Sequence, residues 1–154
     1  MSAHLRILIQ RDAFDQTAEY ERLTKGRTDI GAIVTFTGLC RDEGGTLSAL
    51  ELEHYPAMAE AQLTQIAQDA AQRWPLMDVV VIHRFGVIGI GEPIVLVIAT
   101  SSHRAAAFAG AEYVMDFLKS RAPFWKKDHR ADGQQGQWVE ARDEDESALG
   151  RWQA

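Results

Sequence analysis

Basic side chains bracket one stretch of this chain and carry its clearest chemistry. His103 and Arg104 stand at a predicted helix start, where free backbone N–H groups and the helix dipole favour an anion. Lys119 lies in the last turn, and Lys126 and Lys127 follow a helix break. A guanidinium binds phosphate through paired donors, and an ammonium near other cations is easier to deprotonate and can then act as a nucleophile. The pattern predicts a phosphate-handling site with Lys119 and Lys126 for the chemistry.

An amphipathic helix must position these groups. Ser101 or Ser102 can cap its start, and Pro123 ends it because the residue before a proline is disfavoured in the α region. The helix is predicted over about Arg104 to Arg121, because apolar side chains recur at helical spacing at Ala107, Phe108, Ala111, Val114, Met115 and Leu118.

The length of this helix separates its two basic ends. Arg104 and Lys119 are 15 residues apart in the sequence, which is about 22 Å at the rise of an α-helix. One small ligand cannot contact both side chains within one chain. Either there are two sites, or a symmetric dimer brings Arg104 of one chain beside Lys119 of the other, and we favour the dimer as a hypothesis.

Composition indicates a single cytoplasmic domain. The 154 residues are 46% hydrophobic and 25% charged, which is ordinary for a globular protein. The single cysteine, Cys40, excludes an internal disulfide framework and suits a reducing compartment. No targeting peptide or membrane-length apolar run is evident, and the net charge of −6 argues against nucleic-acid binding. We expect one domain over 1–143 and a mobile tail over 144–154.

Charge is unevenly spread along the chain. Between Lys119 and Arg130 five basic residues stand against Asp128 alone, whereas 140–146 holds five acids. A basic patch on an acidic protein fits a small anion or an acidic partner tail, and a solvated charged surface is the alternative.

Strands and further helices surround the central helix in an α+β pattern. The connections over 41–46 and 86–92 are too short for parallel crossovers, so each is predicted to join an antiparallel hairpin. The result is a split βαβ core of the ferredoxin-like kind. The predicted strands are Leu5–Ile9 at an edge, Ile30–Leu39, Leu47–Tyr55, Met77–Phe85, Ile94–Thr100 near the centre and a last one around Gln137–Ala141, and the predicted helices are Asp15–Lys25 and Pro56 to Pro75.

Other motifs have plainer interpretations. The glycines of GVIGIGEP match neither a dinucleotide fingerprint nor a P-loop, and the histidines, among them His54 and His83, lack metal-ligand spacing. We therefore expect no metal and no cofactor, and interpret both histidines as satisfied, partly buried side chains. Cys40 is either a nucleophile or a small apolar residue that fills the core, and we favour the second interpretation. Phe124 and Trp125 either stack on a flat ligand or pack in the core.

Several blocks together resemble the large, catalytic subunit of molybdopterin synthase, the MoaE family. They keep the family's order over most of the chain from Gly31 to Asp143. The combination of HR, LKSRAPFWK and WVEAR is specific, although no single block is. The blocks are GAIVTFTGLCRD, LELEHYPAMAE, VIHRFGVIGIGE, SSHRAAAF, FLKSRAPFWKKD and WVEARD.

The resemblance implies an α/β hammerhead fold and a central homodimer with a small ubiquitin-like subunit on each outer end, a heterotetramer. The small subunit would present a C-terminal Gly-Gly thiocarboxylate. Two sulfur transfers to cyclic pyranopterin monophosphate would then form the dithiolene of molybdopterin, which makes the expected activity that of a sulfurtransferase.

The resemblance also implies a set of site residues. Lys119 and Lys126 would be catalytic, and Arg142 would lie near the channel for the partner's tail. The residues that would bind substrate are Leu39, Cys40, Arg41, His103, Arg104, Lys119, Lys126, Lys127 and Asp128. A non-catalytic dimeric scaffold for an acidic tail and a phosphate-ester hydrolase are the alternatives.

Overall fold

The computed structural model of the chain has α+β architecture, as predicted, and describes residues 3–42, 44–45, 47–121, 124–130, 135–139 and 149–152. The predicted site residue Arg142 lies outside these ranges, as does most of the predicted tail. The elements in order are β1 (His4–Gln10), α1 (Gln16–Thr24), β2 (Ala32–Leu39), β3 (Leu47–His54), α2 (Pro56–Arg73), β4 (Leu76–Arg84), β5 (Gly86–Gly89), β6 (Pro93–Ser101), α3 (Arg104–Arg121), β7 (Phe124–Arg130), β8 (Gln135–Val139) and a 3₁₀ turn (Gly150–Trp152).

The first sheet has the strand order β1-β4-β6-β2. As predicted, β1 lies at an edge, β6 is central, and the short 86–92 connection leaves β4 and β6 antiparallel. β1 runs parallel to β4. The near-continuous apolar runs of β4 and β6 reflect burial on both faces, since a sheet covered on both sides needs no polar alternation.

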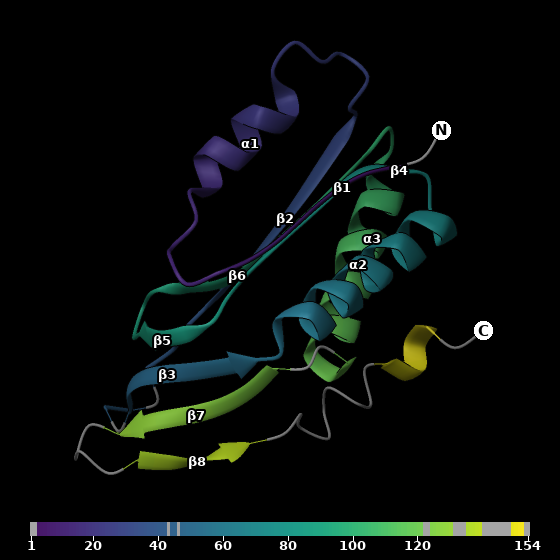
Figure 1. Cartoon of the computed structure of the whole chain (residues 1–154). Helices are drawn as coiled ribbons and strands as arrows, with labels where there is room; N and C mark the ends of the chain where they lie inside the picture. Colours follow the sequence, from purple (N-terminus) through teal and green to yellow (C-terminus); the bar gives the residue numbers. More distant parts are fainter. Residues whose placement is uncertain are drawn as a thin grey trace.

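Helices cover both faces of this sheet (Figure 1). Val79 and Val81 face the side on which α2 and α3 pack, whereas Val80 and Ile82 face α1 and its Leu23. This alternation follows from the two-residue period of a strand. α3 therefore runs along the sheet between two fixed ends, one near the start of β2 and one near the second sheet.

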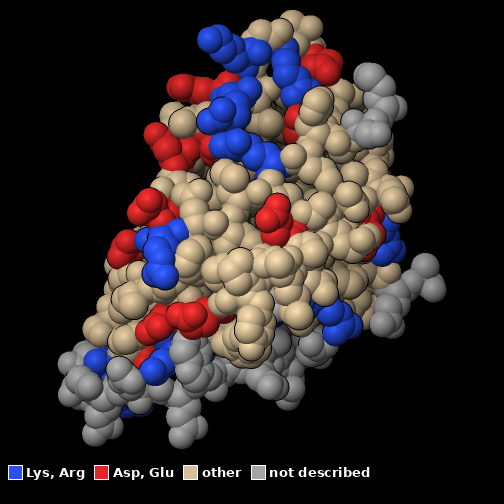
Figure 2. Space-filling model, in the orientation of Figure 1, with Lys and Arg blue, Asp and Glu red and all other residues tan. Residues whose placement is uncertain are grey.

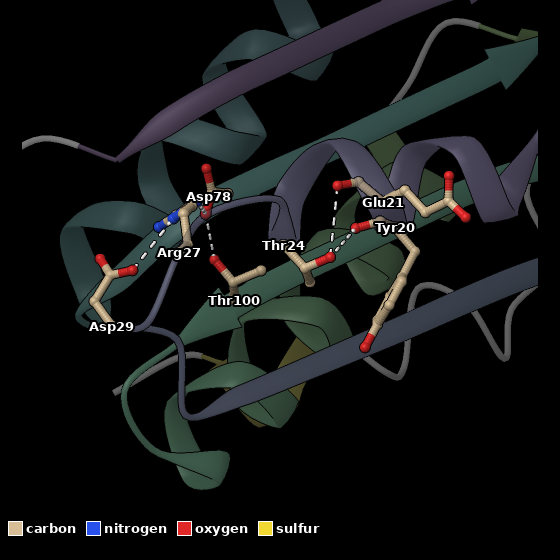
Figure 3. Close-up of polar contacts among 7 residues, drawn as sticks. All are labelled: Tyr20, Glu21, Thr24, Arg27, Asp29, Asp78 and Thr100. Atoms are coloured by element: carbon tan, nitrogen blue, oxygen red, sulfur yellow. Dashed lines mark hydrogen bonds and ion pairs between the residues drawn. The ribbon is translucent and has the colours of Figure 1, made fainter.

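A partly buried ion pair ties the end of α1 to the first sheet (Figure 3). Arg27 Nη1 lies 2.7 Å from Asp78 Oδ2, and the Thr100 hydroxyl donates to the same oxygen at 2.6 Å. Asp78 and Thr100 are buried. Arg27 also reaches Asp29 at 3.3 Å, so one guanidinium links two carboxylates. The loop after α1 is thereby fixed where β2 begins.

The second sheet has the order β5-β3-β7-β8 and overturns one prediction. The expected hairpin between residues 30–39 and 47–55 is wrong, because β2 pairs with β6 while β3 pairs with β5 and β7. A register shift at Gly38/Leu39 ends the ladder of β2, and the Cys40 N–H donates to the Glu92 carbonyl at 2.9 Å. The chain turns away there, so the short connection joins two sheets instead of two neighbours.

The structure contains two strands that were not predicted from the sequence. The segment from Gly86 to Glu92 contains strand β5 as well as a turn, because residues 86–89 pair with β3. The polar run after α3, Phe124–Arg130, is strand β7. The last predicted strand is present as β8, two residues earlier than expected.

The described end of the chain packs on the helices. Trp152 contacts the rings of Trp74 and Tyr113 edge-to-face, and its indole N–H donates to Asp116 at 2.5 Å. Leu149 is buried. Mobility of the remaining predicted tail stays a prediction. No helix within the described ranges is long and apolar enough to span a membrane.

Candidate functional site

The start of α3 presents His103 and Arg104 to solvent. Both side chains are exposed, and the backbone N–H of His103 donates to the hydroxyl of buried Ser101 at 3.3 Å. That hydroxyl in turn donates to the Pro75 carbonyl at 2.9 Å. Ser101 therefore bonds to the residue that precedes the helix and not to an N–H of its first turn, so the predicted serine cap is not seen, although this bond fixes the direction in which the chain enters α3.

Gly31 allows β2 to approach this corner. Its N–H donates to the Ser101 carbonyl at 3.0 Å, and any Cβ at this position would overlap the carbonyl of Ser102. The backbone just before β2 and the backbone before α3 are therefore in contact. His103 and Arg104 sit directly beyond that contact.

Lys119 and Lys126 lie on two elements that meet at the other end of the molecule. Lys119 is exposed in the last turn of α3, and Lys126 is half-buried on β7 opposite Leu52. Directly opposed residues of antiparallel strands share a face, so Lys126 and Asp128 project on the side of buried Leu52 and Leu50. Lys127 projects on the other face.

Asp128 contains a buried carboxylate oxygen, Oδ1, that accepts no hydrogen bond from the part of the chain that the structure describes. Buried carboxylate oxygens are nearly always paired in folded proteins. The inner face of β7 at Asp128 can therefore accept a hydrogen bond from a donor outside the described part of the chain.

Cys40 and its neighbours complete this end of the molecule. Cys40 is 2% exposed and packs with Leu50, Leu52 and Ile88. This burial agrees with the interpretation of Cys40 as an apolar filler. Leu39 before it is exposed at 56%, and Arg41 after it is exposed as well.

The structure brings only part of the predicted site together. Lys126, Asp128 and Cys40 share one side of the second sheet, and Lys119 approaches from α3. His103 and Arg104 belong to the opposite end of α3, which is one continuous helix over Arg104–Arg121 (Figure 1). The separation expected along the helix is therefore present within one chain.

A stack of rings, which the sequence indicates only as ordinary packing, lies where α3, β4 and β7 meet. The rings of Phe124 and His83 are 3.9 Å apart and 16° from parallel, and His54 stacks on Phe124 at 5.7 Å. Phe124 is thus a core plug, and Trp125 packs edge-on against Tyr55. The only signal in the sequence was a histidine inside a buried apolar strand.

Burial keeps the two histidines neutral. The pKa of His83 is lowered to about 4, chiefly by burial, and the charge of Lys119 lowers it further, against a hydrogen bond with the Arg84 carbonyl at 2.8 Å that raises it. Burial likewise lowers the pKa of His54.

An open cleft of about 610 Å³ lies beside this stack. His54 and Phe85 form part of its wall, together with Arg11 and the first turn of α2. None of the predicted site residues that the structure describes lines it. The face shown in Figure 2 gathers Lys and Arg at its upper end, over α1 and the loop that follows, away from the second sheet.

Comparison with known proteins gives consistent matches. The family model described as "MoaE protein" matches residues 9–121. The molybdopterin synthase catalytic subunit of Mesorhizobium japonicum is 60% identical over 148 residues, 96% of this chain and 93% of that protein. The structure of the molybdopterin biosynthesis MoaE protein from Burkholderia ambifaria is 47% identical with a TM-score of 0.81, covering 97% of each chain.

A more distant solved structure shares the fold alone. It is a protein–protein complex of subunits 1 and 2 of molybdopterin-converting factor from Helicobacter pylori. The matched chain is 22% identical, with a TM-score of 0.67 over 90% of each chain.

Proposed function

The chain belongs to the MoaE family, and from this premise we propose that it is the catalytic subunit of a molybdopterin synthase. The match to the relative from Mesorhizobium japonicum extends over nearly the whole of both chains, which supports a shared activity. The enzyme acts in the synthesis of the molybdenum cofactor.

The proposed reaction is a sulfur transfer. A small ubiquitin-like partner brings sulfur as a C-terminal thiocarboxylate, and two such transfers convert cyclic pyranopterin monophosphate into the dithiolene of molybdopterin. The Helicobacter pylori structure, a complex of two subunits of molybdopterin-converting factor, supports a two-subunit assembly. Because the sulfur arrives already activated, buried Cys40 need not carry it.

The proposed roles follow the chemistry of each group. Lys119 assists attack at the thiocarboxylate and the opening of the cyclic phosphate, and Lys126 stabilises the charge that develops. Arg41, His103 and Arg104 bind the phosphate, since guanidinium and imidazole groups donate to its oxygens.

The remaining predicted residues complete the pocket in this proposal. Leu39, Cys40 and Asp128 line it, and the Oδ1 of Asp128 accepts from a donor of the substrate. Lys127 adjoins the pocket from the neighbouring position of β7, with its side chain on the other face. Arg142 lies near the channel for the partner's tail.

The observation that supports the proposal is the contact between the His83 and Phe124 rings, which joins β4 to the strand that carries Lys126, near the end of the helix that carries Lys119. Lys119 acts electrostatically on His83, His83 stacks on Phe124, and Lys126 lies two residues further along the same face of β7. In this proposal both ammonium groups act on one substrate, at the end of the molecule where the second sheet begins.

We further propose that the site is shared within a homodimer, at the centre of a heterotetramer. Arg104 cannot reach the Lys119 of its own chain, because α3 separates them by about 22 Å. A two-fold axis places the start of one α3 beside the end of the other.

The test is turnover with a thiocarboxylated partner and the pterin substrate. We expect Lys119→Ala to abolish dithiolene formation, a loss of at least about a hundredfold in kcat, because the group assisting bond formation is removed. Partner binding, measured by calorimetry, should be retained. Lys25→Ala, at the end of α1, is the matched control and should keep full activity.

The same assay separates the alternatives. A scaffold gives no product even with the wild-type chain, and a phosphate-ester hydrolase consumes substrate without a sulfur donor. Full activity of Lys119→Ala would remove this lysine from the mechanism.

A further inference from the structure

The ring stack is a contact between the two sheets. His83 belongs to β4 of the first sheet, where it pairs with Ile9 and Val95. Phe124 opens β7 of the second sheet and pairs with His54 of β3. The 3.9 Å contact between the His83 and Phe124 rings therefore fixes one sheet against the other at a single buried point.

The two elements that carry the lysines of the proposed site both lie against the His83–Phe124 contact. His83 has the same strand parity as Val79 and Val81, so its ring lies on the side of the first sheet that α3 covers. The last turn of α3 carries Lys119, whose charge acts on His83. Phe124 sets where β7 begins, and Lys126 follows it on the same face.

The His83 ring is itself held in a fixed orientation. It is buried, with 5% of its surface exposed, and its Nδ1 donates to the Arg84 carbonyl at 2.8 Å, so the ring is the Nδ1–H tautomer. The His83 and Phe124 rings are 16° from parallel, and only a flat side chain at position 83 can stack on Phe124 in this way. A neutral ring also adds no repulsion to a neighbouring ammonium.

We propose that His83 is a positioning residue, whose ring sets the spacing of the Lys119 and Lys126 side chains by fixing the start of β7 against the end of α3. The consequence of this spacing for catalysis rests on the proposed function. The spacing itself is a property of the folded chain and is measured without turnover.

The first measurement is chemical cross-linking of the purified full chain with a series of amine-reactive linkers of increasing length. Mass spectrometry gives the yield of the Lys119–Lys126 link at each length. The wild-type chain should show one narrow optimum. His83→Leu, which removes the flat ring, should broaden the profile and lower the best yield at least threefold, and His83→Phe, which keeps a flat ring against Phe124, should restore it.

A matched control separates positioning from loss of stability. Ile82→Ala removes a fully buried side chain from the same strand on the opposite face, toward α1. Compared at equal distance below their melting temperatures, Ile82→Ala should keep the wild-type linker profile. An unchanged profile in His83→Leu, or the same broadening in Ile82→Ala, would overturn the proposal.

Sulfur transfer is the second measurement. His83→Leu should lower kcat at least tenfold with little change in KM, and His83→Phe should recover most of the loss. A wild-type chain that gives no turnover refutes the proposed function and leaves the linker result standing. A broadened linker profile with full kcat refutes the catalytic importance of the spacing.

Discussion

At the scale of single residues, His83 shows how burial changes what a side chain does. In an unfolded chain an imidazole takes up a proton near pH 6.5, whereas in this fold the pKa of His83 is about 4. The groups facing it are Lys119 and His54, which disfavour its protonation, so the ring stays neutral beside a cation.

This pKa predicts a pH dependence of stability. Because the folded pKa lies below the unfolded one, the unfolded state binds more protons as the pH falls, and stability present above about pH 6.5 is lost toward about pH 4. The loss from this group is about 3 kcal/mol. Urea unfolding of wild type and His83→Phe across this range should show a shallower decline in the variant. Parallel curves would contradict it.

Residue types alone indicated the two ends of the predicted site but not the ring stack. His103, Arg104, Lys119 and Lys126 carry charges whose chemistry is visible in the sequence. His83 sits in an apolar run, where a satisfied buried histidine is the ordinary interpretation. Its contact with Phe124 joins residues 41 positions apart, and nothing local encodes it.

At the scale of elements, helix bounds were predictable and strand partners were not. α3 begins and ends where its apolar spacing and Pro123 indicate, since those signals are local. The partner of β2 is β6, more than 50 residues further along the chain, and a six-residue connection to β3 does not decide it. β7 was missed because its charged residues give no apolar alternation, although Leu52 and Leu50 lie opposite them.

The approach of β2 to α3 depends on Gly31. We expect Gly31→Ala to destabilise the fold by about 3 kcal/mol, because the new Cβ would overlap the Ser102 carbonyl and force backbone to move. Denaturant unfolding measures it. Gly150→Ala, where nothing lies within 4 Å, should change stability by less than about 0.5 kcal/mol. Equal stabilities of the two variants would show that the corner adapts freely.

The ion pair between α1 and the first sheet gives a second prediction for elements. Asp78→Asn keeps the shape of the side chain but removes the buried one of the two carboxylates that pair with Arg27, and should cost about 2 kcal/mol because Arg27 retains partial exposure and its contact with Asp29. Chemical denaturation at two salt concentrations measures it. Asp29→Asn, on the exposed side of the same guanidinium, should leave stability unchanged. A large loss of stability in Asp29→Asn would show that Asp29, and not Asp78, is the carboxylate through which Arg27 stabilises the fold.

At the scale of the whole molecule, the proposed dimer can be tested by complementation. Arg104→Ala and Lys119→Ala chains should each be inactive alone, because every site then lacks one group. Mixed and allowed to exchange, they should recover about a quarter of wild-type activity, since half the dimers are mixed and each holds one intact site. Activity assays of the mixture measure this, and no recovery after verified exchange would contradict a site shared between the two chains.

The continuity of α3 has a mechanical consequence for such a dimer. In the proposed dimer, a single rigid helix would carry the phosphate-binding cations of one active site at its N-terminal end and the reacting amine of the other active site at its C-terminal end. A shift of α3 along its axis would move its N-terminal cations toward one active site and its C-terminal lysine away from the other. The geometry of the two active sites would then be coupled, so a substitution in the middle of α3, in contact with neither site, would change the activity of both.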